Sequence, residues 1–184
     1  MKKDQIRLTI KTRKTLLNDD ERRSAARRVF DLLASSAPFL AAEKVLFYHS
    51  LPDELSTLEF LDNYTHRATK SYYLPRVNGV NLDILPYERS RMHLGAFRIE
   101  EPEGNDTVSI DDIDLVIVPA VAFDRHGNRV GRGKGYYDRL LARAKAVKVG
   151  VGYSFQLLDE DVDAEPHDVR VDFVITEDGI FRTR

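Results

Sequence analysis

The chain has 184 residues, of which 42% are hydrophobic and 32% are charged, and its formal net charge is −2. This composition is typical of a folded globular protein, and the length predicts a single domain that spans residues 1–184. The low net charge argues against a nucleic-acid partner. The absence of cysteine excludes a disulfide framework and a thiolate zinc site. Because the chain has no long apolar run and no signal-peptide core, we expect a cytoplasmic protein with no membrane partner.

Two helices are predicted in the first 37 residues. The first has an apolar side and many exposed lysines and arginines. The second begins with a capping box, in which Asn18 caps the first turn and Glu21 bonds back to it, and Pro38 marks its end. The expected apolar residues are Ile6, Leu8, Ile10, Leu16 and Leu17 in the first helix, and Ala25, Val29, Leu32 and Leu33 in the second.

The next segments predict a strand, a helix and a hairpin. Residues 44–50 are expected to form a buried strand, followed by a loop at 51–54 and a helix from about Leu55 to Thr65. Residues 71–77 and 81–87 predict a β-hairpin, because the Asn-Gly step between them is a strong hairpin signal.

The second half of the chain adds further strands. The apolar run Ile113–Phe123 predicts a strand buried on both faces, and residues 147–153 and 172–176 predict two more. The segment Gly95–Pro102 ahead of them is expected to be a loop. Because strands alternate with helices, we expect an α/β fold: a single three-layer α/β/α domain with a mainly parallel sheet and an antiparallel hairpin addition.

A loop that combines glycines with cations follows the apolar run. Its glycines are Gly127, Gly131, Gly133 and Gly135, and its cations are Arg129, Arg132 and Lys134. A helix with an apolar face at Tyr137, Leu140, Leu141 and Ala144 comes next. Free N–H groups at a helix start and glycines that allow close approach favour phosphate binding, although a solvated surface loop is the simpler alternative.

The loop matches neither common nucleotide-binding fingerprint. A Walker A loop requires glycine five positions before the Gly133-Lys134 pair, where this chain has Asn128, and Ser or Thr after the lysine, where it has Gly135. The dinucleotide fingerprint requires its third glycine at the position of Tyr136. Phosphate binding here would therefore follow another pattern.

The run Gly127–Asp138, GNRVGRGKGYYD, resembles the central motif of the 5-formyltetrahydrofolate cyclo-ligase family, whose members are also called 5,10-methenyltetrahydrofolate synthetases. The glycines, cations, paired tyrosines and closing aspartate coincide, although many members of the family carry glycine in place of Lys134. Shorter segments match in the same order: Lys3–Arg7, the loop that carries Glu54, and residues 165–172. The resemblance covers essentially the whole chain.

The resemblance implies an ATP-driven ring closure. Members of the family convert 5-formyltetrahydrofolate to 5,10-methenyltetrahydrofolate and release ADP and phosphate. The formyl oxygen is phosphorylated to give an iminium phosphate, N10 attacks the formyl carbon, and phosphate leaves. The expected ligands are 5-formyltetrahydrofolate, ATP and Mg²⁺, bound by a monomer.

The resemblance also implies roles for individual residues. Arg132 and Lys134 would be catalytic, holding the transferring phosphoryl group. The residues that would contact ATP are Lys3, Arg7, Arg129, Gly131, Arg132, Gly133, Lys134, Gly135, Tyr136 and Tyr137. The residues that would contact folate are His49, Glu54, Arg132 and Tyr136. The ligands of Mg²⁺ would be Asp138 and Asp172. We expect one tyrosine of the pair to stack on substrate and the other to lie in the core. His49 replaces an expected aliphatic residue and is interpreted as part of the pocket wall.

Two other functions remain open from the residues alone. A non-catalytic module could use the same loop to bind a nucleotide or an RNA 5′ end, but the low net charge counts against it. A sugar-phosphate isomerase on a similar α/β scaffold would bind phosphate and need no ATP. Substrate-dependent ATP hydrolysis distinguishes the cyclo-ligase from both.

Overall fold

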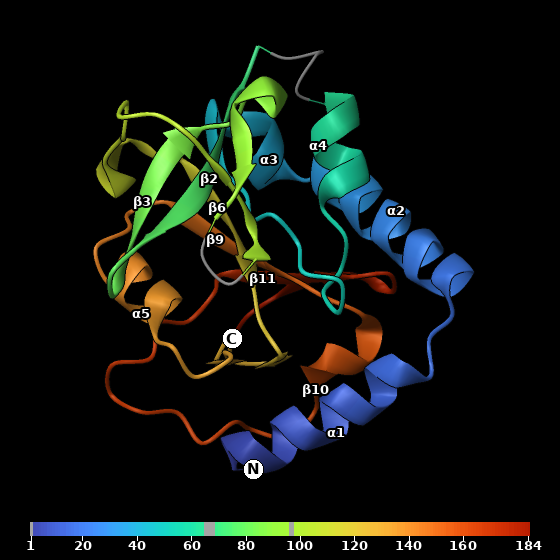
Figure 1. The fold of residues 1–184 in the computed structure, drawn as a ribbon. Coiled ribbons are helices and arrows are strands. Elements are labelled where there is room, and N and C mark those ends of the chain that lie inside the picture. The colour runs from blue at the N-terminus through green and yellow to red at the C-terminus, as the bar shows by residue number, and fades with distance from the viewer. Residues whose placement is uncertain (1, 65–68, 96–97) are drawn as a thin grey trace.

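A seven-stranded sheet forms the centre of the computed structural model, which describes residues 2–64, 69–95 and 98–184. The strand order is β12-β11-β9-β6-β1-β2-β3 (Figure 1). The bounds are β1 Lys44–Leu46, β2 Ser71–Asn78, β3 Asn81–Pro86, β6 Leu115–Pro119, β9 Val147–Val151, β11 Phe173–Thr176 and β12 Gly179–Arg182. The inner strands are parallel, and β3 and β12 are antiparallel edges. The mainly parallel sheet and the β2–β3 hairpin are confirmed, and β12 is an edge strand that the sequence did not reveal.

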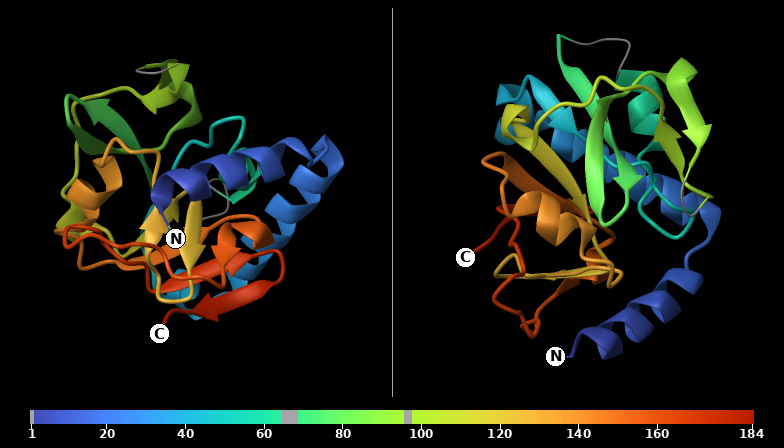
Figure 2. Two further views of the ribbon diagram at one scale, coloured as in Figure 1. Left: turned by 90° about the horizontal axis from the view of Figure 1, so that it is seen from below. Right: turned by 60° about the vertical axis from the view of Figure 1, so that its left-hand side comes forward.

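Helices lie on both faces of this sheet and complete the predicted three layers (Figure 1 and Figure 2). On one face lie α2 Asp19–Ser35, α3 Ala37–Ala41 and α4 Leu58–Tyr64, and on the other lies α5 Tyr136–Leu141. A further helix, α1 Lys3–Thr15, packs on a second, smaller sheet. In β6, Leu115 and Ile117 pack with α2, α3 and α4, whereas Val116 and Val118 pack with α5. This alternation explains the continuous apolar run of a strand buried on both faces. None of the helices in the described ranges is both long and apolar enough to cross a bilayer.

The apolar run predicted as one strand is interrupted after Pro119, where β6 ends. The amide of Gln156 donates to the carbonyl oxygens of Ala120 and Val121 at 3.0 and 2.9 Å, which fixes the break. The chain then enters a second sheet of three strands, with the order β10-β7-β8. These strands are β7 Ala122–Asp124, β8 Arg129–Val130 and β10 Leu157–Leu158. The glycine-rich loop therefore follows a hairpin and not the central strand directly, which corrects the prediction.

The side chain of Asp124 holds this second sheet together. Its Oδ1 accepts the backbone N–H groups of His126 and Asn128, both at 2.9 Å, and its Oδ2 accepts the N–H of Val162 at 3.0 Å. The inner face of α1 packs on the sheet through Ile6 and Ile10. As a result, the first helix lies beside the glycine-rich loop, although more than a hundred residues separate them in the sequence.

Some predicted boundaries move by several residues. Pro38 does not end the second helix but lies in the first turn of α3, where its missing N–H costs nothing. The strand expected at 44–50 continues as an extended segment after Leu46, and α4 begins at Leu58. The expected end of α4 at Thr65 lies outside the described residues.

Two further expectations change. Leu8 and Leu16 are exposed and not part of the buried side of the first helix. The segment Gly95–Pro102, expected to be a loop, contains β5 (Glu100–Pro102), which pairs with β4 (Met92–Leu94), while residues 96–97 lie outside the described ranges. Single turns of 3₁₀-helix connect elements at Arg89–Arg91, Ile110–Asp112 and Ser154–Gln156.

The predicted capping box of α2 is confirmed and yields a test of stability. Asn18 Oδ1 accepts the N–H of Glu21, and Glu21 Oε2 accepts the N–H of Asn18, both at 2.9 Å. We expect Asn18→Ala to lower the free energy of unfolding by about 1 kcal/mol, because the N–H of Glu21 loses its acceptor. Urea unfolding measures this loss. Asn18→Asp keeps an acceptor oxygen and should retain most of the stability, so an equal loss in both variants would contradict the explanation.

Candidate functional site

A cavity of about 820 Å³ lies at the carboxyl end of the parallel sheet, beyond the ends of β1 and β6. Such crevices are where open α/β sheets bind ligands. It contains all but one of the predicted site residues, namely Lys3, Arg7, His49, Glu54, Arg129, Gly131, Arg132, Gly133, Lys134, Gly135, Tyr136, Tyr137 and Asp138. The missing residue is Asp172.

The lining of the cavity is of two kinds. One part, which we name the apolar wall, is formed by Pro75, Val77, Leu82 and Ile99 together with His49. The other part, the cation loop, consists of residues 129–135, and it lies beside the cations of α1. A ligand with both an apolar ring system and phosphate groups would match this division.

Left-handed backbone shapes the cation loop. Gly133 has φ 94° and Gly135 has φ 69°, values that side chains with a Cβ rarely adopt. Gly135 is the N-cap of α5, which has six residues and ends at Leu141. Because α5 is shorter than the helix predicted to extend to Ala144, its dipole contributes less to anion binding than the sequence suggested.

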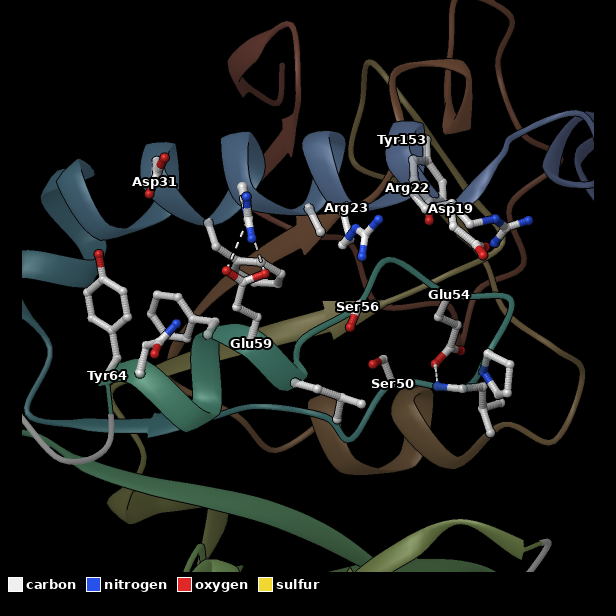
Figure 3. A pocket seen from close by; sticks show the side chains of 18 residues that line it. Asp19, Arg22, Arg23, Asp31, Ser50, Glu54, Ser56, Glu59, Tyr64 and Tyr153 are labelled. Carbon is white, nitrogen blue, oxygen red and sulfur yellow. Dashed lines mark hydrogen bonds and ion pairs between the residues drawn. The ribbon is translucent and has the colours of Figure 1, made fainter.

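Arg132 is bound by two carboxylates of the loop after β1. Its Nη2 lies 2.6 Å from Asp53 Oδ1, and its Nε lies 3.2 Å from Glu54 Oε1. Glu54 also accepts the N–H of Leu51 at 2.9 Å (Figure 3). The residue predicted to hold a phosphoryl group and the residue predicted to hold folate are therefore bound to each other.

Asp53, which pairs with Arg132, was not predicted as a site residue, although its position next to Glu54 was a usable signal. Partial burial would raise the pKa of the Asp53 carboxyl, but its bond with Arg132 and the nearby Lys14 ammonium outweigh burial and hold the pKa below its ordinary value. Lys14 Nζ lies 3.8 Å from Asp53 Oδ2. The ion pair thus joins α1, the loop after β1 and the cation loop.

Arg129 and Asp138 form a second ion pair, at 2.5 Å between Nη2 and Oδ1. The Arg129 guanidinium also lies over the ring of Tyr137, 5.8 Å from its centroid. Arg129 is buried, and among the described residues its Nε has no hydrogen-bond partner. One buried N–H donor therefore remains for an anionic ligand.

The two tyrosines of the motif lie in different surroundings, and one of them packs against the core as predicted. Tyr137 packs against the core, and burial raises the pKa of its hydroxyl. Tyr136 donates its O–H to the carbonyl of Gly79 at 3.3 Å, and Arg139 lies over its ring at 5.5 Å. The core role predicted for one tyrosine is confirmed, and stacking of the other on substrate stays a prediction.

The cations of α1 reach the cavity as predicted. Lys3 Nζ lies 2.6 Å from Asp168 Oδ2, and Arg7 donates from Nε to the carbonyl of Gly131 at 2.9 Å. Partial burial would raise the pKa of the Asp168 carboxyl, but the N–H of Glu165 and the Lys3 ammonium outweigh it, so the pKa is lowered. The carboxylate of Asp168 is therefore the ionised form near neutral pH.

Asp172 does not line this cavity. It precedes β11, and its Oδ2 accepts the N–H of Lys148 at 2.8 Å, next to the start of β9. The starts of parallel strands lie at the sheet edge opposite their carboxyl ends, which separates Asp172 from the cation loop. The residues that the structure brings to the cavity from this segment are Glu165, His167 and Asp168, none of which was predicted as a site residue.

A smaller cavity of about 450 Å³ lies between α2 and α4 (Figure 3). Its charged rim is largely occupied, since Arg27 pairs with Glu59 at 3.0 Å and Arg23 pairs with Asp20. Glu54 is the predicted site residue that it shares with the larger cavity. The larger cavity is therefore the candidate functional site.

Comparisons with known proteins show which proteins this chain is similar to. The sequence model of the 5-formyltetrahydrofolate cyclo-ligase family matches residues 1–177. The 5-formyltetrahydrofolate cyclo-ligase of Escherichia coli K12 is 28% identical over 181 residues, covering 94% of this chain and 98% of the relative, and that of Mus musculus is 26% identical over 190 residues, covering 95% and 93%. The NMR structure of Aquifex aeolicus 5,10-methenyltetrahydrofolate synthetase superposes with a TM-score of 0.89 at 35% identity, covering 99% of this chain and 93% of that one.

Lys14 provides a test of the charge network. It is 5% exposed, and burial lowers the pKa of its ammonium, with Asp53 offsetting only part of the effect. The unfolded chain then binds this proton more tightly than the folded one, so the stability due to Lys14 rises as the pH increases toward about 10. We expect the wild type to gain stability relative to Lys14→Met between about pH 7 and about pH 10 in urea unfolding. The exposed Lys11→Met should change stability by less than about 0.5 kcal/mol at neutral pH. A wild-type-to-Lys14→Met difference that does not vary with pH would contradict the assignment.

Proposed function

Because the chain belongs to the 5-formyltetrahydrofolate cyclo-ligase family, we propose that it closes the ring of 5-formyltetrahydrofolate with ATP and releases 5,10-methenyltetrahydrofolate, ADP and phosphate. The observation that supports this reaction best is one cavity lined by both an apolar wall and a cation loop. The family is one of enzymes, which favours this function over a non-catalytic anion-binding module and over a sugar-phosphate isomerase.

The chemistry requires activation of a poor leaving group. The formamide oxygen of the substrate leaves poorly, and phosphorylation by ATP converts it into a phosphate that can depart from an iminium phosphate. In phosphoryl transfer side chains form few covalent bonds with the substrate, so the protein mainly aligns two ligands and stabilises charge. A cavity with two kinds of lining suits this task.

The ATP phosphates would lie against the cation loop. Lys3 and Arg7 approach it from α1, Arg129 offers its buried Nε–H, and Arg132 and Lys134 would hold the transferring group. Preorganised donors of this kind lower the barrier most when water is excluded.

The folate would occupy the apolar wall, with Glu54 as the acceptor for amino and ring N–H donors of the pterin. Glu54 also binds Arg132. A pterin that takes Glu54 as its partner weakens the hold on Arg132 and leaves this guanidinium available for phosphate. Folate binding would thereby prepare the cation loop for ATP.

Asp138 and Asp168 would hold a magnesium ion. Both carboxylates line the cavity, and the N–H of Val169, next to Asp168, lies 3.5 Å from Asp138 Oδ1. Carboxylates that face phosphate oxygens are the ligands that Mg²⁺ prefers, and when bound the ion would neutralise phosphate charge. Asp168 thus replaces Asp172 as the proposed second ligand, while Asp138 is retained.

The first prediction from the proposed function concerns Arg132. We expect Arg132→Ala to lower kcat/KM roughly a hundredfold, or by about 2.7 kcal/mol, because a donor to the transferring phosphoryl group is lost. Near-ultraviolet absorbance of the methenyl product and folate-dependent ADP release measure the rate. Arg125→Ala is the matched control, because Arg125 pairs with Asp159 and does not line the cavity. Equal activity of Arg132→Ala and wild type would remove Arg132 from the mechanism.

The metal assignment is tested by three substitutions. We expect Asp138→Asn and Asp168→Asn to raise the Mg²⁺ concentration for half-maximal activity at least roughly tenfold, because each loses a charged oxygen ligand. Asp172→Asn should leave that concentration unchanged, because Asp172 binds the backbone of Lys148. A shift in Asp172→Asn without one in Asp168→Asn would restore Asp172 as the ligand.

A further inference from the structure

Arg139 in α5 connects two parts of the cavity lining, although it does not itself line the cavity. Its Nε donates to the carbonyl of Val80 at 2.8 Å, in the turn of the β2–β3 hairpin. Its Nη2 donates to the carbonyl of Lys134 at 2.9 Å, in the cation loop. The hairpin turn lies beside α5 in two views of the fold (Figure 1 and Figure 2). One guanidinium therefore joins a hairpin to a loop that lies far from it in the sequence.

The hairpin supplies three of the four apolar residues of the apolar wall. Pro75 and Val77 belong to β2 and Leu82 belongs to β3, and all three line the cavity. Val77 and Leu82 are partners across the hairpin, and Leu82 follows Val80 by two residues. A displacement of the turn would therefore move the wall against which the folate is proposed to lie.

The cation loop needs a contact of this kind because its backbone is permissive. Lys134 lies between Gly133 and Gly135, and both glycines have positive φ. The bond from Arg139 to the carbonyl of Lys134 fixes the plane of the peptide between Lys134 and Gly135. A Cβ added at Gly135 would lie 2.8 Å from Nη1 of Arg139, so glycine leaves room there for the guanidinium.

Tyr136 adds to the contact between α5 and the hairpin. The Arg139 guanidinium lies over the Tyr136 ring, 5.5 Å from its centroid, and the Tyr136 O–H donates to the carbonyl of Gly79 at 3.3 Å. A planar guanidinium with its fixed fork of donors suits two carbonyl oxygens and an aromatic face better than the compact ammonium of lysine does. The arrangement therefore favours arginine at position 139.

We propose that Arg139 is a positioning residue that holds the apolar wall and the cation loop at the separation that the proposed reaction requires. The inference deepens the proposed function and rests on it. Transfer of a phosphoryl group to the formyl oxygen requires close alignment of two ligands, one against each part of the lining. A displacement of about 1 Å can lower such a rate roughly a hundredfold, so a link between the two parts bears directly on kcat.

Arg139→Met is the decisive variant, because methionine is a good helix former and lacks the guanidinium. Arg139 is exposed, so the substitution leaves the core unchanged. We expect kcat, measured from the absorbance of the methenyl product, to fall roughly tenfold to a hundredfold. The Kd of ATP–Mg²⁺ alone and that of 5-formyltetrahydrofolate alone, measured by calorimetric titration, should change less than about threefold, because alignment acts on the reaction and not on either binding step.

Rescue separates alignment from general damage to the fold. Guanidinium ion at non-denaturing concentration should restore part of the kcat of Arg139→Ala, because it can occupy the place of the missing group. Arg139→Lys should have a kcat between those of Arg139→Ala and the wild type, since an ammonium replaces only part of the contacts.

Two variants serve as controls. Arg143→Ala is the matched control, because Arg143 is an exposed arginine just beyond α5 that does not line the cavity. Its kcat should equal that of the wild type and should not rise with guanidinium ion. Asn18→Ala removes the cap of α2 and should also keep the wild-type kcat, which shows that a moderate loss of stability does not by itself impair alignment.

The outcomes distinguish this inference from the function on which it rests. If the wild type forms the methenyl product and Arg139→Met keeps the wild-type kcat, Arg139 does not align the ligands and the proposed function stands. A lower kcat with an equal loss of affinity for either ligand alone, or with no rescue by guanidinium ion, also overturns the inference, because it indicates a damaged site. If the wild type forms no methenyl product with ATP, the proposed function fails and the inference fails with it.

Discussion

Pairing of partly buried cations with carboxylates from distant segments is the constraint on which the site depends. Lys3 binds Asp168, Arg129 binds Asp138, and Arg132 binds Asp53 and Glu54. A buried charge is costly unless it is paired, and this applies most strongly to Arg129, which is the buried cation of the three, whereas Arg132 is exposed. The same pairs tie α1, the cation loop and the segment around 165–168 to one another.

These pairs bear on how the proposed ligands would bind. In the proposed reaction phosphate oxygens would replace internal carboxylates as partners of the cations, so binding of an anion would exchange one set of charge contacts for another and leave few charges uncompensated. Glu54 has a special place in this exchange, because it touches Arg132 and also borders the part of the cavity proposed for the pterin. The two ligands would then be aligned in the same step in which the cations exchange their carboxylate partners for phosphate.

The second sheet gives these charges their positions. Asp124 binds backbone N–H groups on both sides of the β7–β8 turn and the N–H of Val162, so the cation loop leaves a fixed hairpin. α1 rests on this hairpin through Ile6 and Ile10, which brings Lys3 and Arg7 to the cavity. A helix near the end of a chain is often poorly ordered unless it is tied down, and here apolar packing and the Lys3 and Arg7 contacts both tie it.

The sequence by itself determined the elements whose signals are local. The capping box at Asn18, the Asn-Gly hairpin and the alternation in β6 depend on neighbouring residues, and the dense motif Gly127–Asp138 pointed to the family and supplied most of the predicted site residues that line the cavity. Only the tertiary structure decided that β6 stops at Pro119, that Asp53 joins Arg132, and that Asp168 rather than Asp172 reaches the cavity. Those outcomes depend on which sheet edge a residue lies at and on contacts between segments far apart in the chain, and neither is encoded in the order of neighbouring residues.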